Sequence, residues 1–184
     1  MGIKSQAKPC RISQNYRYIC RMNFDTKTTV AFTGHRTYNG EADIALRETI
    51  VRLYNDGYRT FLCGMATGFD MAAAEAVLEL RDEQSDIQLV CVIPFEGQSR
   101  RFNAEQRNRY DTICRAANHV VTLATQYSPM AYHRRNDFLV DNSSALIAYF
   151  DGSKGGTAYT VRRALKSLHR YTNLYIDPQQ EFAF

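Results

Sequence analysis

From residue 28 onward, short apolar segments alternate with longer segments whose apolar residues recur at helical spacing. The short segments are rich in β-branched and aromatic residues and end near Gly, Pro or Asp, which is typical of strands. They predict strands at Thr28–Thr33, Arg59–Cys63, Ile87–Ile93, His119–Ala124, Ala145–Phe150 and, as a short last strand, Leu174–Ile176. The longer segments predict helices at Glu41–Asn55, Asp70–Gln84, Ala104–Ala117, Met130–Asn142 and Thr157–His169.

This alternation implies βαβ units, which build a parallel sheet with right-handed crossovers. The almost unbroken apolar run Ile87–Ile93 suits a strand that is covered on both faces. We therefore predict an α/β protein with a Rossmann-like, doubly wound, mostly parallel sheet of about five to six strands and helices on both faces.

Residues 1–27 differ from the rest because they are polar, basic and without periodicity. They hold six Lys and Arg against Asp25 alone, whereas residues 28–184 hold 17 Lys and Arg against 18 Asp and Glu. The sequence predicts a basic N-terminal arm at 1–27, disordered or loosely attached, and a single domain at 28–184. The net charge of +4 comes from the arm, and the domain itself is not basic. The charge of the domain therefore disfavours a nucleic-acid partner. Met22 precedes the first strand, so Met1 and Met22 are alternative starts.

The composition predicts a cytoplasmic protein without a membrane segment. No apolar run is long enough for a membrane helix, and no signal peptide is visible. The odd number of cysteines without a Cys-x-x-Cys pair favours reduced thiols over disulfides or a zinc site, and we expect no metal. The cysteines are Cys10, Cys20, Cys63, Cys91 and Cys114.

The stretch Phe61–Glu75 carries the strongest chemical signal. It combines a short strand, a turn flanked by Gly64 and Gly68, and a helix that opens at Asp70, the predicted N-cap. Such a unit can hold a phosphate on the N–H groups of the helix N-terminus. A tight turn without a ligand explains one such loop equally well.

Three further glycine-bearing loops follow strands at the same predicted edge, where ligands of parallel sheets bind. One of them, Gly155-Gly156-Thr157, opens another helix, so two loops together favour a phosphate site. The Gly155-Gly156-Thr157 loop is neither a Walker A loop nor a standard G-x-G-x-x-G fingerprint. The predicted ligand-binding residues are Thr33, Gly34, His35, Arg36, Gly64, Ala66, Thr67, Gly68, Asp70, Pro94, Asp151, Gly155, Gly156 and Thr157.

The sequence does not name a catalytic pair. Candidates are Arg135, which lies near the start of a helix, and the carboxylates Glu75 and Glu96; each is also compatible with a solvated or packing role. A cluster of arginines, interrupted by aromatic residues, is interpreted as the charged face of a surface helix. The alternative is a surface that binds the phosphate backbone of a nucleic acid. The cluster consists of Arg100, Arg101, Arg107 and Arg109.

Taken together, Thr33–Arg36, Gly64–Asp70, Arg135-Asn136 and Gly155–Thr157 resemble the SLOG superfamily, which contains the LOG proteins and DprA. Over about Thr28 to Asp177 the chain most resembles the YpsA-like branch of small, largely uncharacterised bacterial proteins. The resemblance implies a Rossmann-like fold and a nucleotide or nucleotide-derived ligand, of the NAD or ADP-ribose type, held by the glycine loops. It implies either a sensor or an enzyme of undetermined reaction.

Two relatives imply sharper alternatives. LOG enzymes cleave the base from a nucleoside monophosphate with an arginine, which Arg135 matches, and a glutamate, whose position Thr160 occupies here. The resemblance to DprA implies a single-stranded DNA binder. Homo-oligomer formation stays open.

Overall fold

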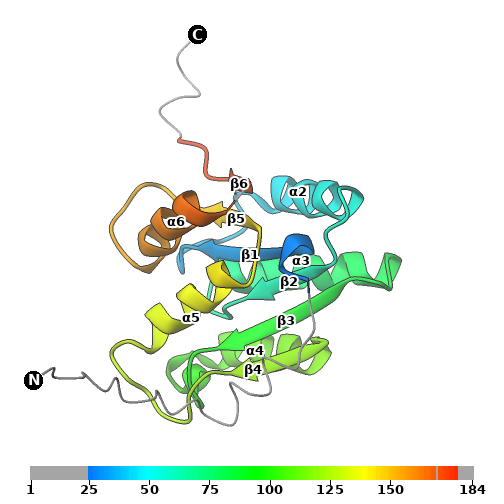
Figure 1. The fold of residues 1–184 in the computed structure, drawn as a ribbon. Coiled ribbons are helices and arrows are strands. Elements are labelled where there is room, and N and C mark those ends of the chain that lie inside the picture. Colours follow the sequence, from blue (N-terminus) through cyan, green and yellow to red (C-terminus); the bar gives the residue numbers. More distant parts are fainter. Residues whose placement is uncertain (1–24, 169, 178–184) are drawn as a thin grey trace, which may run out of the picture.

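The computed structural model describes residues 25–168 and 170–177, and within them six strands form one sheet in the order β4-β3-β2-β1-β5-β6 (Figure 1). All neighbouring strands are parallel. The strands are β1 Thr29–Gly34, β2 Thr60–Cys63, β3 Gln88–Ile93, β4 His119–Thr122, β5 Ala145–Tyr149 and β6 Arg170–Asn173. The helices are α2 Asp43–Asn55, α3 Phe69–Glu83, α4 Ala104–Ala116, α5 Ala131–Asp141 and α6 Gly156–Ser167, with 3-10 turns η1 Thr26–Thr28 and η2 Gln98–Arg101.

Two apolar cores cover the two faces of the sheet, because successive strand side chains point in opposite directions. Phe32 and Phe61 belong to the core under α2, α3 and α4, whereas Ala31 and Leu62 belong to the core under α5 and α6. Figure 1 shows α5 and α6 together on one side of the sheet. The predicted α/β, doubly wound architecture is confirmed.

The order of the strands reverses at β1. The chain adds β2, β3 and β4 on one side of β1 and then returns to add β5 and β6 on the other. The loops that follow β1 and β5 therefore diverge, and a crevice is left at the carboxyl ends of these strands, where ligands of such sheets bind.

The prediction of the last strand at Leu174–Ile176 is wrong. The strand is β6, Arg170–Asn173, which pairs with β5 in the register Ala145 to Arg170. It is an edge strand of half-exposed residues, so it lacks the apolar run that the prediction sought. Leu174, directly after β6, is buried. Its apolar side chain explains why the sequence predicts the strand too close to the C-terminus. α6 correspondingly ends at Ser167, and Leu168 is already extended.

The described structure begins inside the predicted arm. Asp25 caps η1 through the Lys27 N–H, and its carbonyl accepts a bond from the Thr29 hydroxyl. Residues 25–27 thus join the folded body, while the rest of the arm, both candidate start methionines, Cys10 and Cys20 lie outside the described residues. The three described cysteines are free thiols: Cys63, Cys91 and Cys114.

Candidate functional site

The glycine loop between β2 and α3 packs against the segment that follows β1. Gly68 has φ +76°, and a Cβ there would collide with the carbonyl groups of His35 and Arg36. The Phe69 N–H donates to the His35 carbonyl at 3.2 Å. Met65, which is fully buried, adopts φ 55°, and the Gln98 amide holds its carbonyl at 2.6 Å. The loop is therefore fixed from both sides, and glycine is required at position 68.

Asp70 is not the N-cap of α3, contrary to the sequence prediction. The helix begins at Phe69 with Gly68 at the N-cap position and no side-chain cap. The Asp70 carboxylate turns back into the loop, where it accepts the Ala66 N–H at 3.1 Å. Burial raises the pKa of Asp70, although the neighbouring Arg135 guanidinium and the Ala66 N–H act in the opposite direction.

Arg135 of α5 reaches across the sheet edge to this loop. Its Nη1 donates to the Gly64 carbonyl and lies 3.5 Å from the Asp70 carboxylate, and its Nε donates to Asn136 Oδ1 at 2.8 Å. Only 6% of Arg135 and 4% of Asp70 are exposed, so the two charges form a buried pair. Burial lowers the pKa of Arg135, and the Asp70 carboxylate opposes that shift.

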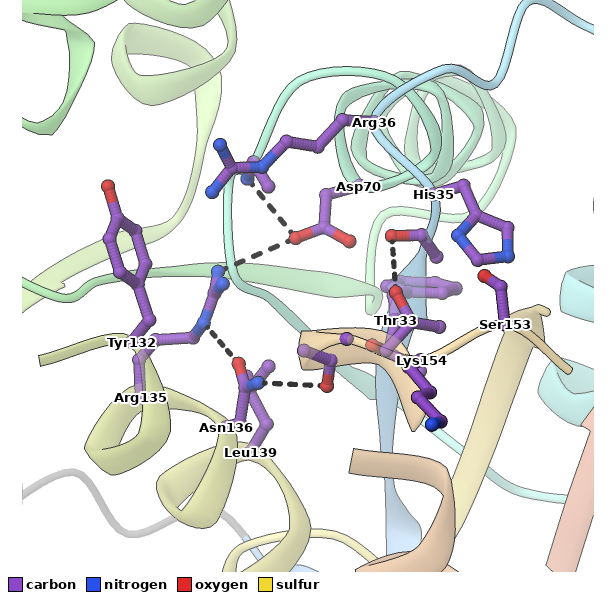
Figure 2. Close-up of a pocket in the computed structure, with 16 residues that line it drawn as sticks. Thr33, His35, Arg36, Asp70, Tyr132, Arg135, Asn136, Leu139, Ser153 and Lys154 are labelled. Carbon is purple, nitrogen blue, oxygen red and sulfur yellow. Dashed lines mark hydrogen bonds and ion pairs between the residues drawn. The ribbon is translucent and has the colours of Figure 1, made fainter. Parts of the chain in front are cut away.

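Asn136 extends this network to α6, as Figure 2 shows. Its Nδ2 donates to the Gly156 carbonyl at 3.4 Å. The Thr157 hydroxyl donates to the Gly34 carbonyl at 3.0 Å and ties the start of α6 to the end of β1. Gly155 occupies the N-cap position with φ 151° and no side-chain cap, so the first N–H groups of α6 keep their hydrogen-bonding capacity.

These elements surround a pocket of about 280 Å³. Ten of the residues predicted for the site from sequence line it: Thr33, Gly34, His35, Arg36, Ala66, Asp70, Arg135, Gly155, Gly156 and Thr157. The structure thus brings together side chains from the loops after β1, β2 and β5 and from α5, all at the switch in strand order (Figure 2).

Three other predicted residues shape the pocket without lining it. Gly64 leaves the space that the Arg135 guanidinium occupies, and Gly68 permits the close contact with the segment after β1. Asp151 binds His35, whose Nε2 lies 2.8 Å from its carboxylate. The Ser153 hydroxyl and N–H and the His35 contact lower the pKa of Asp151.

The remaining candidates lie elsewhere. Pro94 is buried beyond the end of β3. Thr67 and Glu96 line a neighbouring cavity. Glu75 lies in a groove between α2 and α3, where both of its carboxylate oxygens bind the Arg109 guanidinium. Of the three catalytic candidates, Arg135 is therefore the one that reaches the pocket.

The sequence prediction of the site omitted six lining residues: Phe32, Tyr132, Asn136, Leu139, Ser153 and Lys154. Tyr132, Arg135, Asn136 and Leu139 recur at helical spacing along α5, so they present one face of that helix to the pocket. That spacing was readable in the sequence once α5 was placed beside the pocket. Arg134, their neighbour in the chain, is exposed.

The acid–base capacity of the pocket is small. Among the described residues that line it, Asp70 is the single carboxylate, and Ala66 and Arg135 already engage it. Thr160 is fully buried, and its hydroxyl donates to the Gly156 carbonyl within α6. Across residues 25–168 and 170–177, no group of three or more His, Cys, Asp or Glu gathers as metal ligands, and no helix could span a membrane.

A family model described as the YspA SLOG family matches residues 41–181, which include the glycine loop, α5 and the start of α6. The chain belongs to the YspA SLOG family. A UPF0398 protein from Bacillus thuringiensis is similar to this chain, with 31% identity over 143 residues. The matched part covers 73% of this chain and 78% of the relative. A UPF0398 protein from Bacillus cereus is 30% identical over the same length.

Solved structures share the fold. DNA processing protein A (DprA) from Streptococcus pneumoniae has a TM-score of 0.61 at 20% identity, over 79% of this chain and 50% of that one. DprA from Helicobacter pylori, solved to explain its single-stranded DNA binding mode, has a TM-score of 0.60 at 18% identity, over 80% and 65%. The chain thus spans half to two thirds of these proteins, and the likeness shows a common architecture.

Proposed function

We propose that this protein binds a phosphate-bearing, nucleotide-derived ligand of the NAD or ADP-ribose type in the pocket beyond β1 and β5. The observation that carries the proposal is the uncapped start of α6 beside the buried Arg135 guanidinium, with Asn136 connecting the two. A helix N-terminus offers N–H donors and about half a positive charge, and a guanidinium offers planar donors that match phosphate oxygens.

The charge of the lining supports an anionic ligand. Arg36, Arg135 and Lys154 line the pocket against the single carboxylate of Asp70, so cationic groups remain after Asp70 and Arg135 are paired. Gly155 and Gly156 keep side chains away from the helix end, as a phosphate that approaches the backbone requires. The volume of about 280 Å³ lies near the lower end of ligand pockets, roughly 300–1,000 Å³, and suits one nucleotide unit.

Binding without turnover, as in a sensor, fits this pocket better than catalysis. A hydrolase of the LOG type needs a carboxylate near the sugar, and the one carboxylate of the lining is engaged in the Arg135 network. A hydrolase would release free base or ribose phosphate and would lose this activity in Arg135→Ala. A sensor would bind tightly and release neither product.

The test is thermal unfolding with AMP, ADP, ATP, GMP, NAD, ADP-ribose and a short DNA oligomer. A specific ligand at about 100 times its dissociation constant adds about 2.7 kcal/mol, which raises the Tm by several degrees for a chain of this size. Gly156→Asp should abolish the shift by repelling phosphate. Gly156→Asn, which has the same size without the charge, is the matched control and should reduce the shift less. A Cβ at Gly156 meets its nearest neighbour at 3.8 Å, so the first side-chain atom of either variant has room.

Single-stranded DNA binding is the second candidate function. The shared fold with DprA and the arginines near the pocket favour it. This candidate predicts that the oligomer alone shifts the Tm and that its affinity falls steeply with salt. A shift with NAD or ADP-ribose that Gly156→Asp removes supports the small-ligand proposal; a shift with the oligomer alone overturns it.

A further inference from the structure

A second cavity, of about 760 Å³, adjoins the first pocket. It lies among the glycine loop, η2 and the loops that follow β3 and β4. Arg36 and Tyr132 line both cavities, and the Arg36 guanidinium lies 5.5 Å from the centre of the Tyr132 ring. Figure 2 places these two side chains at the end of the first pocket away from Ser153 and Lys154. The two cavities are therefore neighbours that share the side chains of Arg36 and Tyr132 as a common wall.

Three aromatic side chains gather in the second cavity. The Phe95 ring lies 5.3 Å from the Tyr127 ring and 5.7 Å from the Tyr132 ring, centre to centre, and the two tyrosine rings lie 6.5 Å apart. Tyr127 is 60% exposed even though it belongs to this cluster. An exposed ring that is held by two neighbours is a suitable platform for a planar base, because every base has a π-face to stack.

The polar lining of the second cavity suits the phosphates of the same ligand. Arg36, Arg100 and Arg101 line it, and among the described residues none of the three forms a salt bridge. Glu96 is its single carboxylate in the described part of the chain. Arg36 stands at the junction, so it is placed to meet phosphates that link two nucleosides.

We propose that the second cavity is a subsite for the second half of a dinucleotide, two aromatic rings joined through a pyrophosphate. This proposal rests on the proposed function: one nucleotide lies at the start of α6, the pyrophosphate passes Arg36, and the second ring stacks on the aromatic cluster. The observations favour a bounded dinucleotide over a long strand. The rings of Phe95, Tyr127 and Tyr132 form one compact cluster, and residues 28–184 hold 17 Lys and Arg against 18 Asp and Glu.

The experiment compares the affinities of AMP, ADP-ribose and NAD by isothermal titration calorimetry, because the chain has no tryptophan for a fluorescence signal. NAD, the probe with a ring at each end, should bind more tightly than ADP-ribose, which has one. Tyr127→Ala should weaken NAD binding about five- to a hundredfold, as the loss of one base–aromatic stack does, and should leave AMP binding unchanged. Tyr127→Phe keeps the ring and should keep the affinity for NAD.

The outcomes separate this inference from the proposed function. If AMP binds and Gly156→Asp abolishes its binding, but NAD binds wild type and Tyr127→Ala equally, the first site stands and the second subsite is refuted. If Tyr127→Ala weakens only a DNA oligomer, the cavity belongs to a polynucleotide path and the dinucleotide proposal is overturned. If no mononucleotide or dinucleotide binds in a way that depends on Gly156, both proposals fail.

Discussion

The guanidinium of Arg135 occupies the space that a side chain at Gly64 would fill. A Cβ on Gly64 would overlap the Nη1 atom of Arg135, which donates to the Gly64 carbonyl. The two residues lie 71 positions apart in the chain, yet each determines what the other can be. The site therefore depends on an absent side chain as much as on those present.

The first prediction follows from this overlap. Gly64→Ala should displace Arg135, reduce the free energy of unfolding by about 1–3 kcal/mol and weaken nucleotide binding. Urea unfolding and calorimetry would measure both effects. Gly156→Ala, where a Cβ has room, is the control for the change in stability. Because the two residues touch, the effects of Gly64→Ala and Arg135→Ala should be non-additive; additive effects would contradict the proposed overlap.

The second prediction concerns the buried pair. Arg135→Ala should reduce the free energy of unfolding by about 3–5 kcal/mol, because it leaves the Asp70 carboxylate buried without its guanidinium partner. Arg134→Ala, one position earlier and exposed, should change stability by less than about 0.5 kcal/mol. Equal losses in the two variants, measured by urea unfolding, would show that the pair is not buried as described.

The third prediction is a pH dependence that originates from Asp70. Burial raises the pKa of Asp70 in the folded state above its unfolded value of about 3.8, so the folded protein binds the proton more tightly. The contribution of Asp70 to stability is therefore largest below pH 3.8 and falls as pH rises through the folded-state pKa. Relative to Asp70→Asn, which does not titrate, the wild type should lose stability across this window. If the wild type instead gained stability relative to Asp70→Asn as the pH rises, the pKa of Asp70 would be lowered by folding and not raised.

The fourth prediction separates the two hydroxyls at the start of α6. Thr157→Val should cost about 1 kcal/mol and weaken ligand binding, because the Thr157 hydroxyl ties α6 to the Gly34 carbonyl. Thr160→Val removes a bond inside the helix and should leave ligand affinity unchanged. Thermal unfolding with and without ligand measures both. A larger binding loss in the Thr160 variant would count against the described role of Thr157.

The fifth prediction concerns Glu75, a catalytic candidate from sequence. Glu75→Gln should leave ligand binding unchanged and should cost less than about 1 kcal/mol, because its pair with Arg109 is partly exposed and lies in another groove. Calorimetry on this variant beside Arg135→Ala would check the assignment. A loss of ligand affinity in Glu75→Gln would contradict this prediction and indicate that Glu75 contributes to ligand binding.

The sequence allowed the sheet and the converging glycine loops to be predicted, because alternating apolar segments and glycine turns are local signals. It did not allow the directions of side chains after those loops to be predicted. Asp70 suited an N-cap by type, but the helix starts one residue earlier and its carboxylate points back to Ala66. Glu75 faces Arg109, which is 34 positions away, and no local pattern encodes that pairing.

Other parts of the site required the fold before their pattern had meaning. Tyr132 and Leu139 lie three positions before and four after Arg135, a spacing that marks a helix face but not what the face contacts. β6 was misplaced for a related reason, since an edge strand is held by its backbone pairing with β5 and not by apolar side chains.

The glycine loop also gives a direct route to chemical probes of this protein. Ala66 lines the first pocket and Thr67 lines the second cavity, so adjacent residues of one rigid turn contact the two spaces. Two weakly binding fragments, each found separately in one space, could be joined by a linker that crosses at Arg36 and Tyr132. The second fragment would then bind at an effective concentration in the millimolar range.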